Sequence, residues 1–214
     1  MNDILSPVPV SPFEPCYTGH GQGVTNADAA AANNKKRASR PPVECGPLPF
    51  LIRKNGLWLY QGSPILRKEL VCLFASILQR DRQGDWWLCT PAERGQIEVE
   101  DAPFNAVELE WSGCGRGQVL SFRTNIDQVV TVGIEHPIRV AHDPITCEPI
   151  PYISIRDGDG SHAIEARICR AVYYELVALA VSEVVDSSLM LGIWSSGQFF
   201  PLGPMPSDDI VDQI

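Results

Sequence analysis

The sequence predicts an α+β fold made of two related strand–helix–strand units, the second a curled antiparallel sheet or partial barrel with a packed helix. Three observations predict it. A short apolar block recurs 106 residues after its first occurrence, two segments show the apolar spacing of helices, and turn residues separate a series of short strands. Strands and helices do not alternate regularly enough for βαβ units, which indicates α+β.

The recurring block is Glu69-Leu70-Val71-Cys72-Leu73, which returns as Glu175-Leu176-Val177-Ala178-Leu179. An Ile-Arg pair precedes each copy, at 52–53 and 155–156. A glycine and an aromatic pair follow each copy, starting at Gly84 and Gly197. The three offsets are 103, 106 and 113. We therefore expect one copied unit whose second version gained residues in its loops.

The first unit is expected to begin with a hairpin. Apolar residues 50–53 and 57–60 flank Asn55-Gly56, and Asn-Gly supplies the positive φ of tight hairpin turns. Ser63 then reads as an N-cap with Pro64 at the first helical position. Leu66, Leu70, Leu73, Phe74, Ile77 and Leu78 form one apolar face, which predicts a helix through about Arg80. Strands at 86–89 and 96–99 complete this unit.

The second unit is expected to be mostly strands. Gly113-Cys114-Gly115-Arg116-Gly117 is its clearest turn, and a second helix is expected at about 168–184, with Val172, Leu176, Leu179 and Ala180 inward. A curled antiparallel sheet follows from strands this short. The expected strands are 106–111, 119–124, 129–134, 137–141, 152–156, 163–166, 189–194 and 198–202.

Composition divides the 214 residues into four parts. Residues 1–46 are rich in Pro, Gly, Ala and Asn, so we expect a disordered tail. Residues 47–103 form the smaller N-terminal α+β domain and 104–206 the barrel-like C-terminal domain. Residues 207–214 are expected to fray.

Charge and cysteine usage exclude several classes of protein. The net charge is −9, and the tail's four acids and four bases cancel, so an acidic body disfavours nucleic acid and anionic membranes as partners. The seven cysteines are odd in number and lack metal-ligand spacing, which favours reduced thiols in the cytoplasm. No signal peptide or spanning segment is evident. We expect no metal, no cofactor and no catalytic residue.

Four arginines suggest where a ligand would bind. Arg67 and Arg170 begin the two helices, and Arg53 and Arg156 end equivalent strands. If the units face each other, these side chains would converge near Trp58, Tyr60 or Trp86. Guanidinium groups and aromatic faces suit an anionic, ring-bearing ligand such as a nucleotide. Surface ion pairs with Glu69 or Glu175 are the alternative.

The acidic stretch between Glu93 and Glu110 has a simpler interpretation. Glu98 and Glu100 share one strand face, as do Glu108 and Glu110, so each pair is expected to line a solvated face. The histidines lack a nucleophile motif nearby, and we expect structural roles for them.

Several blocks resemble a bacterial family known as domain of unknown function 1285. The most specific is Val99-Glu100-Asp101-Ala102-Pro103-Phe104, and the match spans about residues 47–204. The other blocks begin at Leu48, Gly62, Thr90, Phe122 and His136.

This resemblance implies a duplicated α+β core whose second domain is similar to pleckstrin-homology barrels, without an established enzymatic activity. It also implies a nucleotide-like ligand between the two domains and a role in signalling. Arg94 stands where the family pattern has Lys, and Gly133 where it has a carboxylate. Together with the arginine argument, the resemblance gives eleven expected ligand-binding residues: Arg67, Thr90, Glu93, Arg94, Asp101, Pro103, Phe104, Thr124, Asn125, His136 and Arg139.

The leading hypothesis is therefore a cytoplasmic protein that binds a small anionic molecule, nucleotide-like in character, at its domain interface in signalling or stress response. The alternative is a protein-interaction scaffold without a small ligand. A hydrolase using Glu93, Asp101 or His136 is the third hypothesis.

Overall fold

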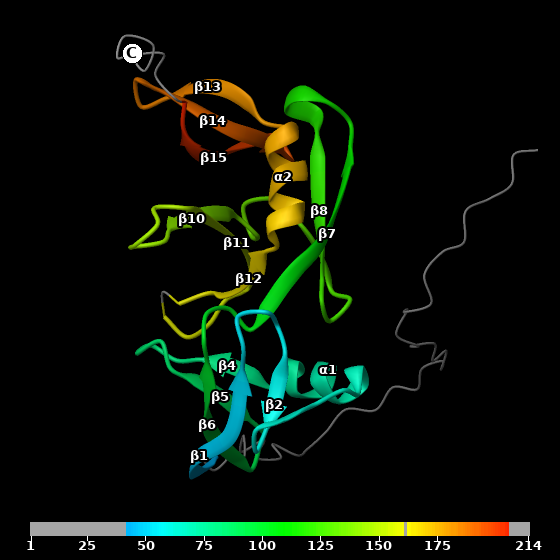
Figure 1. Ribbon diagram of the computed structural model, residues 1–214, viewed down its shortest axis with the longest axis vertical. Helices are drawn as coiled ribbons and strands as arrows, with labels where there is room; N and C mark the ends of the chain where they lie inside the picture. Colours follow the sequence, from blue (N-terminus) through cyan, green and yellow to red (C-terminus); the bar gives the residue numbers. More distant parts are fainter. Residues whose placement is uncertain (1–41, 161, 206–214) are drawn as a thin grey trace, which may run out of the picture. The chain divides into compact units, whose positions relative to one another are not determined.

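Strands dominate the chain. The computed structural model describes residues 42–160 and 162–205, and in these ranges it has fifteen strands, two α-helices and one 3-10 turn. The fold is thus mostly β (Figure 1). Neither helix in the described ranges is long and apolar enough to cross a membrane.

The first six strands form one sheet in the order β3-β2-β1-β6-β5-β4. Its neighbours are antiparallel except β1 and β6, which run parallel with Ile52 opposite Val99. Helix α1 joins β3 to β4. The elements are β1 (Val43–Ile52), β2 (Trp58–Tyr60), β3 (Ser63–Pro64), α1 (Lys68–Ser76), β4 (Leu78–Arg80), β5 (Trp86–Cys89) and β6 (Glu93–Val99).

The next six strands form a second, curled sheet in the order β10-β11-β12-β7-β8-β9. Its parallel pair is β12 and β7, with Ala166 opposite Phe104. The elements are β7 (Phe104–Ser112), the 3-10 turn η1 (Gly115–Gly117), β8 (Val119–Thr124), β9 (Val129–Thr131), β10 (Ile138–His142), β11 (Pro149–Arg156) and β12 (Ile164–Ile168).

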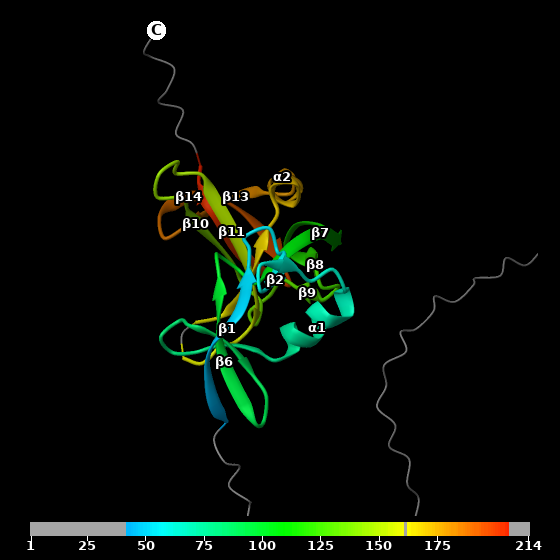
Figure 2. The same cartoon turned by 60° about the horizontal axis from the view of Figure 1, so that its bottom comes forward.

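Helix α2 (Arg170–Ala178) leads into a third sheet, made of β13 (Val181–Val185), β14 (Ser188–Ser195) and β15 (Gln198–Pro204). Figure 1 shows α2 running beside β7 and β8 below this sheet. Val172 and Leu176 of α2 are buried in a core that includes Phe104, Phe122 and Ile193. In the turned view of Figure 2, α1 lies near β9, where Lys68 pairs with Asp127 at 2.6 Å.

The strand pairings show that the chain consists of five successive three-stranded antiparallel meanders, β1–β3, β4–β6, β7–β9, β10–β12 and β13–β15. The two six-stranded sheets share one topology, because in each the first strand of one meander pairs in parallel with the last strand of the next. The units beginning with α1 and α2 share a helix followed by a meander. This fits the duplication predicted from the recurring block.

The predicted alignment of the copies was wrong in detail. The helices begin 102 residues apart, at Lys68 and Arg170, so the Glu-Leu-Val block lies one turn later in α2 than in α1. Gly84 lies between the first and second strands after its helix, whereas Gly197 lies between the second and third. The offsets therefore do not record loops that grow along the chain.

Both helices are shorter than predicted. Ser63 and Pro64 pair with Tyr60 and Leu59 in the sheet instead of starting α1, and Leu78 is buried as part of β4. Strand pairing thus outweighs the helical pattern at both ends. Val172 and Leu176 do face inward as predicted. The residues after Ala180 form β13, in keeping with their β-branched side chains.

The apolar face predicted for the first helix is confirmed only in part: Phe74 and Ile77 pack against the core and Leu78 is buried. Leu66 is 85% exposed and Leu73 is 59% exposed, while Ala75 is buried and Phe74 packs edge-on against Phe50 at 4.9 Å. The aromatic contact of Phe74 with Phe50 therefore turns its end of the predicted face to the sheet, while Leu66 and Leu73 stay exposed.

The Asn-Gly hairpin and the η1 turn are confirmed. Gly56 has φ +80°, and a methyl group there would lie 2.6 Å from Asn125 Nδ2, so both backbone angle and space require glycine. Strand β1 begins at Val43 and so includes the end of the predicted tail. Residues 1–41 and 206–214, where the remaining tail and the fraying end were predicted, lie outside the described residues.

Candidate functional site

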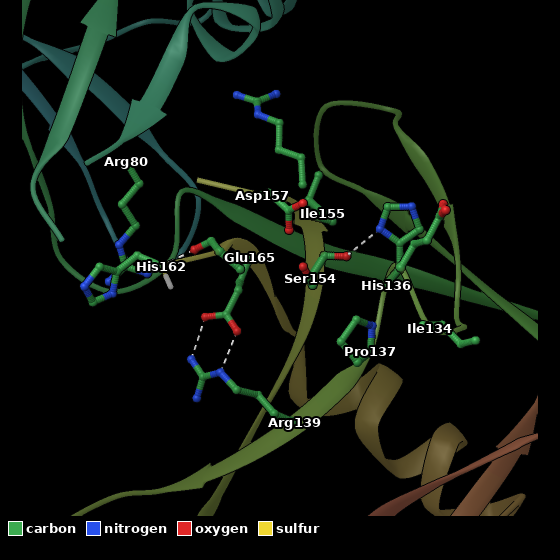
Figure 3. Close-up of a pocket in the computed structure, with 13 residues that line it drawn as sticks. Arg80, Ile134, His136, Pro137, Arg139, Ser154, Ile155, Asp157, His162 and Glu165 are labelled. Carbon is green, nitrogen blue, oxygen red and sulfur yellow. Dashed lines mark hydrogen bonds and ion pairs between the residues drawn. The ribbon is translucent and has the colours of Figure 1, made fainter. Parts of the chain in front are cut away.

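A cavity of about 950 Å³ lined by both charged and apolar residues lies beside β10, β11 and β12 (Figure 3), and we call it the Arg80 cavity. It is lined by three arginines, three carboxylates and two histidines, together with a serine and four apolar residues. The lining residues are Arg80, Ile134, Glu135, His136, Pro137, Arg139, Ser154, Ile155, Arg156, Asp157, His162, Ala163 and Glu165.

The loop between β11 and β12 shapes one wall of this cavity. Asp159 N donates to Arg80 O at 2.7 Å, and Arg80 Nη1 donates to Ala163 O at 3.0 Å, so the loop is tied to β4. Gly158 allows the close approach, because a methyl group there would overlap the His162 carbonyl oxygen and lie 3.1 Å from Arg80 O. This wall of the cavity therefore depends on contacts of Arg80 with Asp159 and Ala163, which lie far from it in the sequence.

Arg80 and Arg156 have only carbonyl oxygens as partners. Arg80 Nε donates to Gly84 O at 3.3 Å, and its guanidinium carbon lies 4.8 Å from the centre of the Trp86 ring. Arg156 Nη2 donates to Ala75 O at 2.7 Å and Leu78 O at 2.8 Å, at the end of α1. Burial lowers the pKa of Arg156. Among the salt bridges found in the described ranges, none involves either side chain.

Arg139 is held differently. Its Nε and Nη2 donate to the two carboxylate oxygens of Glu165 at 2.5 and 2.6 Å, and its guanidinium lies 4.3 Å from the Tyr152 ring centre. The hydrogen bond to Glu165 raises the pKa of Arg139 against the opposing effect of desolvation. This bidentate geometry is the strong form of an arginine–carboxylate pair.

Asp101 extends the network behind Arg139. Tyr152 Oη donates to Asp101 Oδ1 at 2.6 Å, and Arg167 Nη1 donates to Asp101 Oδ2 at 2.7 Å. Strand register places Arg139, Tyr152 and Arg167 side by side on β10, β11 and β12. Desolvation, followed by the bond to Asp101, raises the pKa of Tyr152. Asp101 thus connects the end of the first sheet to the curled sheet.

The two histidines lie on different walls (Figure 3). His136 Nδ1 lies 3.1 Å from Ser154 O, and a ring nitrogen facing a carbonyl must carry the proton, which leaves Nε2 as an acceptor when the ring is neutral. His162 lies near Arg80: a methyl group on Gly84 would be 3.6 Å from His162 Cε1 and 3.9 Å from Arg80 Nη2.

Of the eleven residues predicted to bind ligand, the structure places His136 and Arg139 in the Arg80 cavity. Asp101 adjoins it through Tyr152. Arg67 precedes α1 as its N-cap residue and is exposed. The expected convergence of four arginines does not occur, since only Arg156 lines this cavity and Arg170 lines a separate hollow beside α2.

Three predicted residues hold the turn from β5 to β6. Thr90 Oγ1 donates to Glu93 O at 2.9 Å and accepts from Glu93 N at 3.0 Å. Arg94 Nη2 donates to Glu44 at 2.8 Å, and the guanidinium carbon of Arg94 lies 4.6 Å from the Trp87 ring centre. The turn contacts of Thr90 and Glu93 and the exposed ion pair of Arg94 thus give these three residues structural roles.

The remaining predicted residues are buried or bridge elements. Pro103 and Phe104 are buried, and Thr124 is buried with Oγ1 accepting from Gln128 N at 3.1 Å. Asn125 Oδ1 accepts from Asn105 N at 3.1 Å, and its Nδ2 donates to Gly56 O at 3.3 Å. Asn125 therefore joins the β1–β2 hairpin to β7 and β8.

Sequence reasoning missed most of the cavity. The predicted site residues did not include Arg80, Ser154, His162 or Glu165. Arg80 was predicted at the end of a helix, and the other three belong to no motif. The Glu108 and Glu110 pair is found on one face as predicted, with Arg123 at 2.8 and 3.7 Å.

The family models and the solved structures that match this chain all belong to the same family. Residues 39–102 match the model of the N-terminal domain of DUF1285, a domain of unknown function, and residues 103–202 match that of the C-terminal domain. A DUF1285 family crystal structure from Silicibacter pomeroyi DSS-3 is 40% identical, with TM-score 0.69, covering 80% of this chain and 91% of that one.

A second DUF1285 crystal structure, from Shewanella baltica OS155, is 24% identical with TM-score 0.45, covering 61% of this chain and 91% of that one. A search of curated proteins found no match.

Proposed function

This chain belongs to the DUF1285 family, whose function is unknown, and we propose that it binds a small anionic molecule in the Arg80 cavity. The observation that supports this most strongly is the pair of guanidinium groups of Arg80 and Arg156. Each has carbonyl partners only, with no carboxylate at ion-pair distance in residues 42–160 and 162–205. Buried or half-buried charges are usually paired, so an anion would complete the site.

His136 and Arg139 would assist on the opposite wall. His136 can present Nε2 to a ligand proton, or donate from it when protonated. Arg139 also lines the cavity. Its Nε and Nη2 bond to Glu165, which leaves Nη1 as a donor for a ligand. The cavity size is at the upper end of the range of roughly 300–1,000 Å³ that small-ligand sites occupy.

A thermal-shift screen of the full chain tests the proposal. A ligand at 100 times its Kd should stabilise the protein by about 2.7 kcal/mol, which for a chain of this size raises Tm by roughly 5–10 °C. The screen contains phosphate, pyrophosphate, phosphorylated sugars, nucleotides and dicarboxylates. No shift with any of these anions would contradict the proposal.

A variant pair locates the site. Arg80→Gln retains hydrogen-bond donors but loses the charge, and it should weaken binding of the best anion about 10- to 100-fold, because hydrogen bonds to charged groups contribute about 1.5–3 kcal/mol. Arg116→Gln is the matched control, since Arg116 is exposed and lies near Glu183 in another part of the fold. Equal weakening by both variants would indicate a nonspecific charge effect.

The protein-interaction scaffold has one observation in its favour. Leu70 and Leu73 on α1, and Leu66 just before it, are exposed apolar side chains. No partner chain or other feature of the structure identifies what would cover them, so the small-ligand proposal comes first. The hydrolase hypothesis has less support. Asp101 bonds to Tyr152 and His136 to Ser154, and no hydrogen bond joins any two of Glu93, Asp101 and His136 within residues 42–160 and 162–205.

Several finer predictions stay proposals. We place the protein in the cytoplasm and in signalling or stress response, with a ligand that includes nucleotides among its candidates. Classification as α+β, with a second domain like pleckstrin-homology barrels, also stays a proposal beside the mostly-β description.

A further inference from the structure

We infer that the ligand of the Arg80 cavity is a phosphorylated polyol, such as a sugar phosphate, rather than a nucleotide. This inference rests on the proposed function and specifies its ligand. Three features of the cavity carry it: its described walls offer no free aromatic ring, two of its three carboxylates, Glu135 and Asp157, form no salt bridge, and Arg80 lies beside His162 at one side.

The aromatic rings closest to the cavity are already covered. Arg80 lies over Trp86 at 4.8 Å and Arg139 lies over Tyr152 at 4.3 Å. No Phe, Tyr or Trp is among the lining residues that the structure describes. Proteins that hold nucleobases commonly stack them on aromatic side chains. A ligand without a base suits these walls better.

The two carboxylates of the cavity without a salt bridge favour a ligand that carries hydrogen-bond donors. Glu135 and Asp157 line the cavity, are exposed, and form no salt bridge within the described part of the chain. An ionised carboxylate can only accept hydrogen bonds, and it repels phosphate oxygens. Hydroxyl groups of a polyol would donate to these oxygens. A bare anion would gain nothing from them.

The cationic side lies around Arg80. A methyl group on Gly84 would lie 3.9 Å from Arg80 Nη2 and 3.6 Å from His162 Cε1, so both side chains lie beside this glycine. Figure 3 shows them together on one side of the cavity, with Asp157 and Ser154 near the middle and His136 beyond. A phosphate group at Arg80 and His162 would therefore place the attached carbons towards Asp157. Phosphate oxygens suit Arg geometry because guanidinium donates two parallel hydrogen bonds.

Titration calorimetry of the full chain against four probes tests this inference. The probes are a hexose 6-phosphate, the free hexose, inorganic phosphate and adenosine monophosphate. The inference predicts that the hexose phosphate binds at least 10-fold more tightly than inorganic phosphate, and that the nucleotide does not exceed inorganic phosphate. Tighter binding of the nucleotide than the sugar phosphate would overturn it, as would equal affinities for all three anions. Both of those outcomes leave the proposed function standing.

Absence of binding by every phosphate probe would refute this inference, and the proposed function would fall with it only if the other anions of the thermal-shift screen, dicarboxylates included, also failed to bind. A variant tests the hydroxyl contact alone. Asp157→Asn should reduce the advantage of the hexose phosphate about 5- to 10-fold while inorganic phosphate binds at least as tightly as before. Glu98→Gln, an exposed carboxylate on β6, is the control. An unchanged advantage in Asp157→Asn would count against the placement of the hydroxyl groups.

Discussion

Asp101 holds two partners across the junction of the two family domains, so its removal is expected to destabilise the protein strongly. It accepts hydrogen bonds from Tyr152 at 2.6 Å and from Arg167 at 2.7 Å. Residue 101 lies next to the boundary between the two family matches. The Asp101→Ala variant leaves both donors without this acceptor.

The two losses differ in size. Tyr152 is 6% exposed, and an unsatisfied buried hydroxyl costs about 1–3 kcal/mol. The Arg167 side chain is about a third exposed and can turn to water, so its share is below about 1 kcal/mol. Asp101→Ala should therefore reduce the free energy of unfolding by roughly 2–3 kcal/mol and Tm by roughly 4–12 °C.

A double-mutant cycle with Tyr152→Phe separates the terms. In the Tyr152→Phe background, Asp101→Ala should cost about 1–2 kcal/mol less, because the hydroxyl is already absent. Urea unfolding followed by tryptophan fluorescence measures each free energy, and Glu98→Ala is the exposed control. Costs that add without coupling, or an Asp101→Ala protein as stable as the control, would refute the assigned roles.

Three further predictions concern a glycine, a carboxylate and a thiol. Gly158→Ala should lower stability by about 1–3 kcal/mol, because its methyl group meets the His162 backbone, whereas Gly203→Ala, with open space around it, should be near neutral in the same unfolding assay. Equal effects of the two would contradict the packing argument. The Asp81 pKa is lowered from its ordinary value: burial acts in the opposite direction, but hydrogen bonds from Asp85 N, Trp87 and nearby backbone outweigh it. Its stabilising contribution is therefore present above the unfolded-state pKa and lost as pH falls through the folded one, so Asp81→Asn should flatten the decline of Tm as the pH falls below about 4. A parallel decline in both proteins would reject this assignment. Burial raises the pKa of the Cys169 thiol, while Cys114 is exposed, so iodoacetamide at pH 8 should label Cys114 faster by mass spectrometry, and the reverse order would contradict the burial.

Local signals predicted most strands well. Residues 86–89 and 119–124 are strands with the bounds that alternation indicated, and Asn55-Gly56 marks the first hairpin. These elements were predictable because turn chemistry and period-two burial act within a few residues.

The helices show where local reasoning fails. Apolar spacing from Leu66 to Leu78 looked continuous, but Pro64 and Leu78 are taken into strands by partners on β2 and β5. Strand pairing is decided by distant segments, which no helical period reveals. The same reason explains why β13 was read as the end of a helix.

The site was less predictable than the fold. His136 and Arg139 come from a single block, whereas Arg80 lines the cavity because Asp159 and Ala163 bond to it across the chain. Glu165 joins Arg139 only through the register of three strands. Residues such as Thr90 and Asn125 have turn and bridging contacts in the structure, and motif resemblance alone could not separate those roles from ligand binding.

The central claim, that the Arg80 cavity holds an anion, is tested most directly by crystals of the full chain soaked in tungstate, a phosphate mimic with a strong anomalous signal. The account predicts an anomalous peak within hydrogen-bond distance of Arg80 in the native chain and its loss in Arg80→Gln. A peak bound only elsewhere, or one that persists unchanged in the variant, would contradict it.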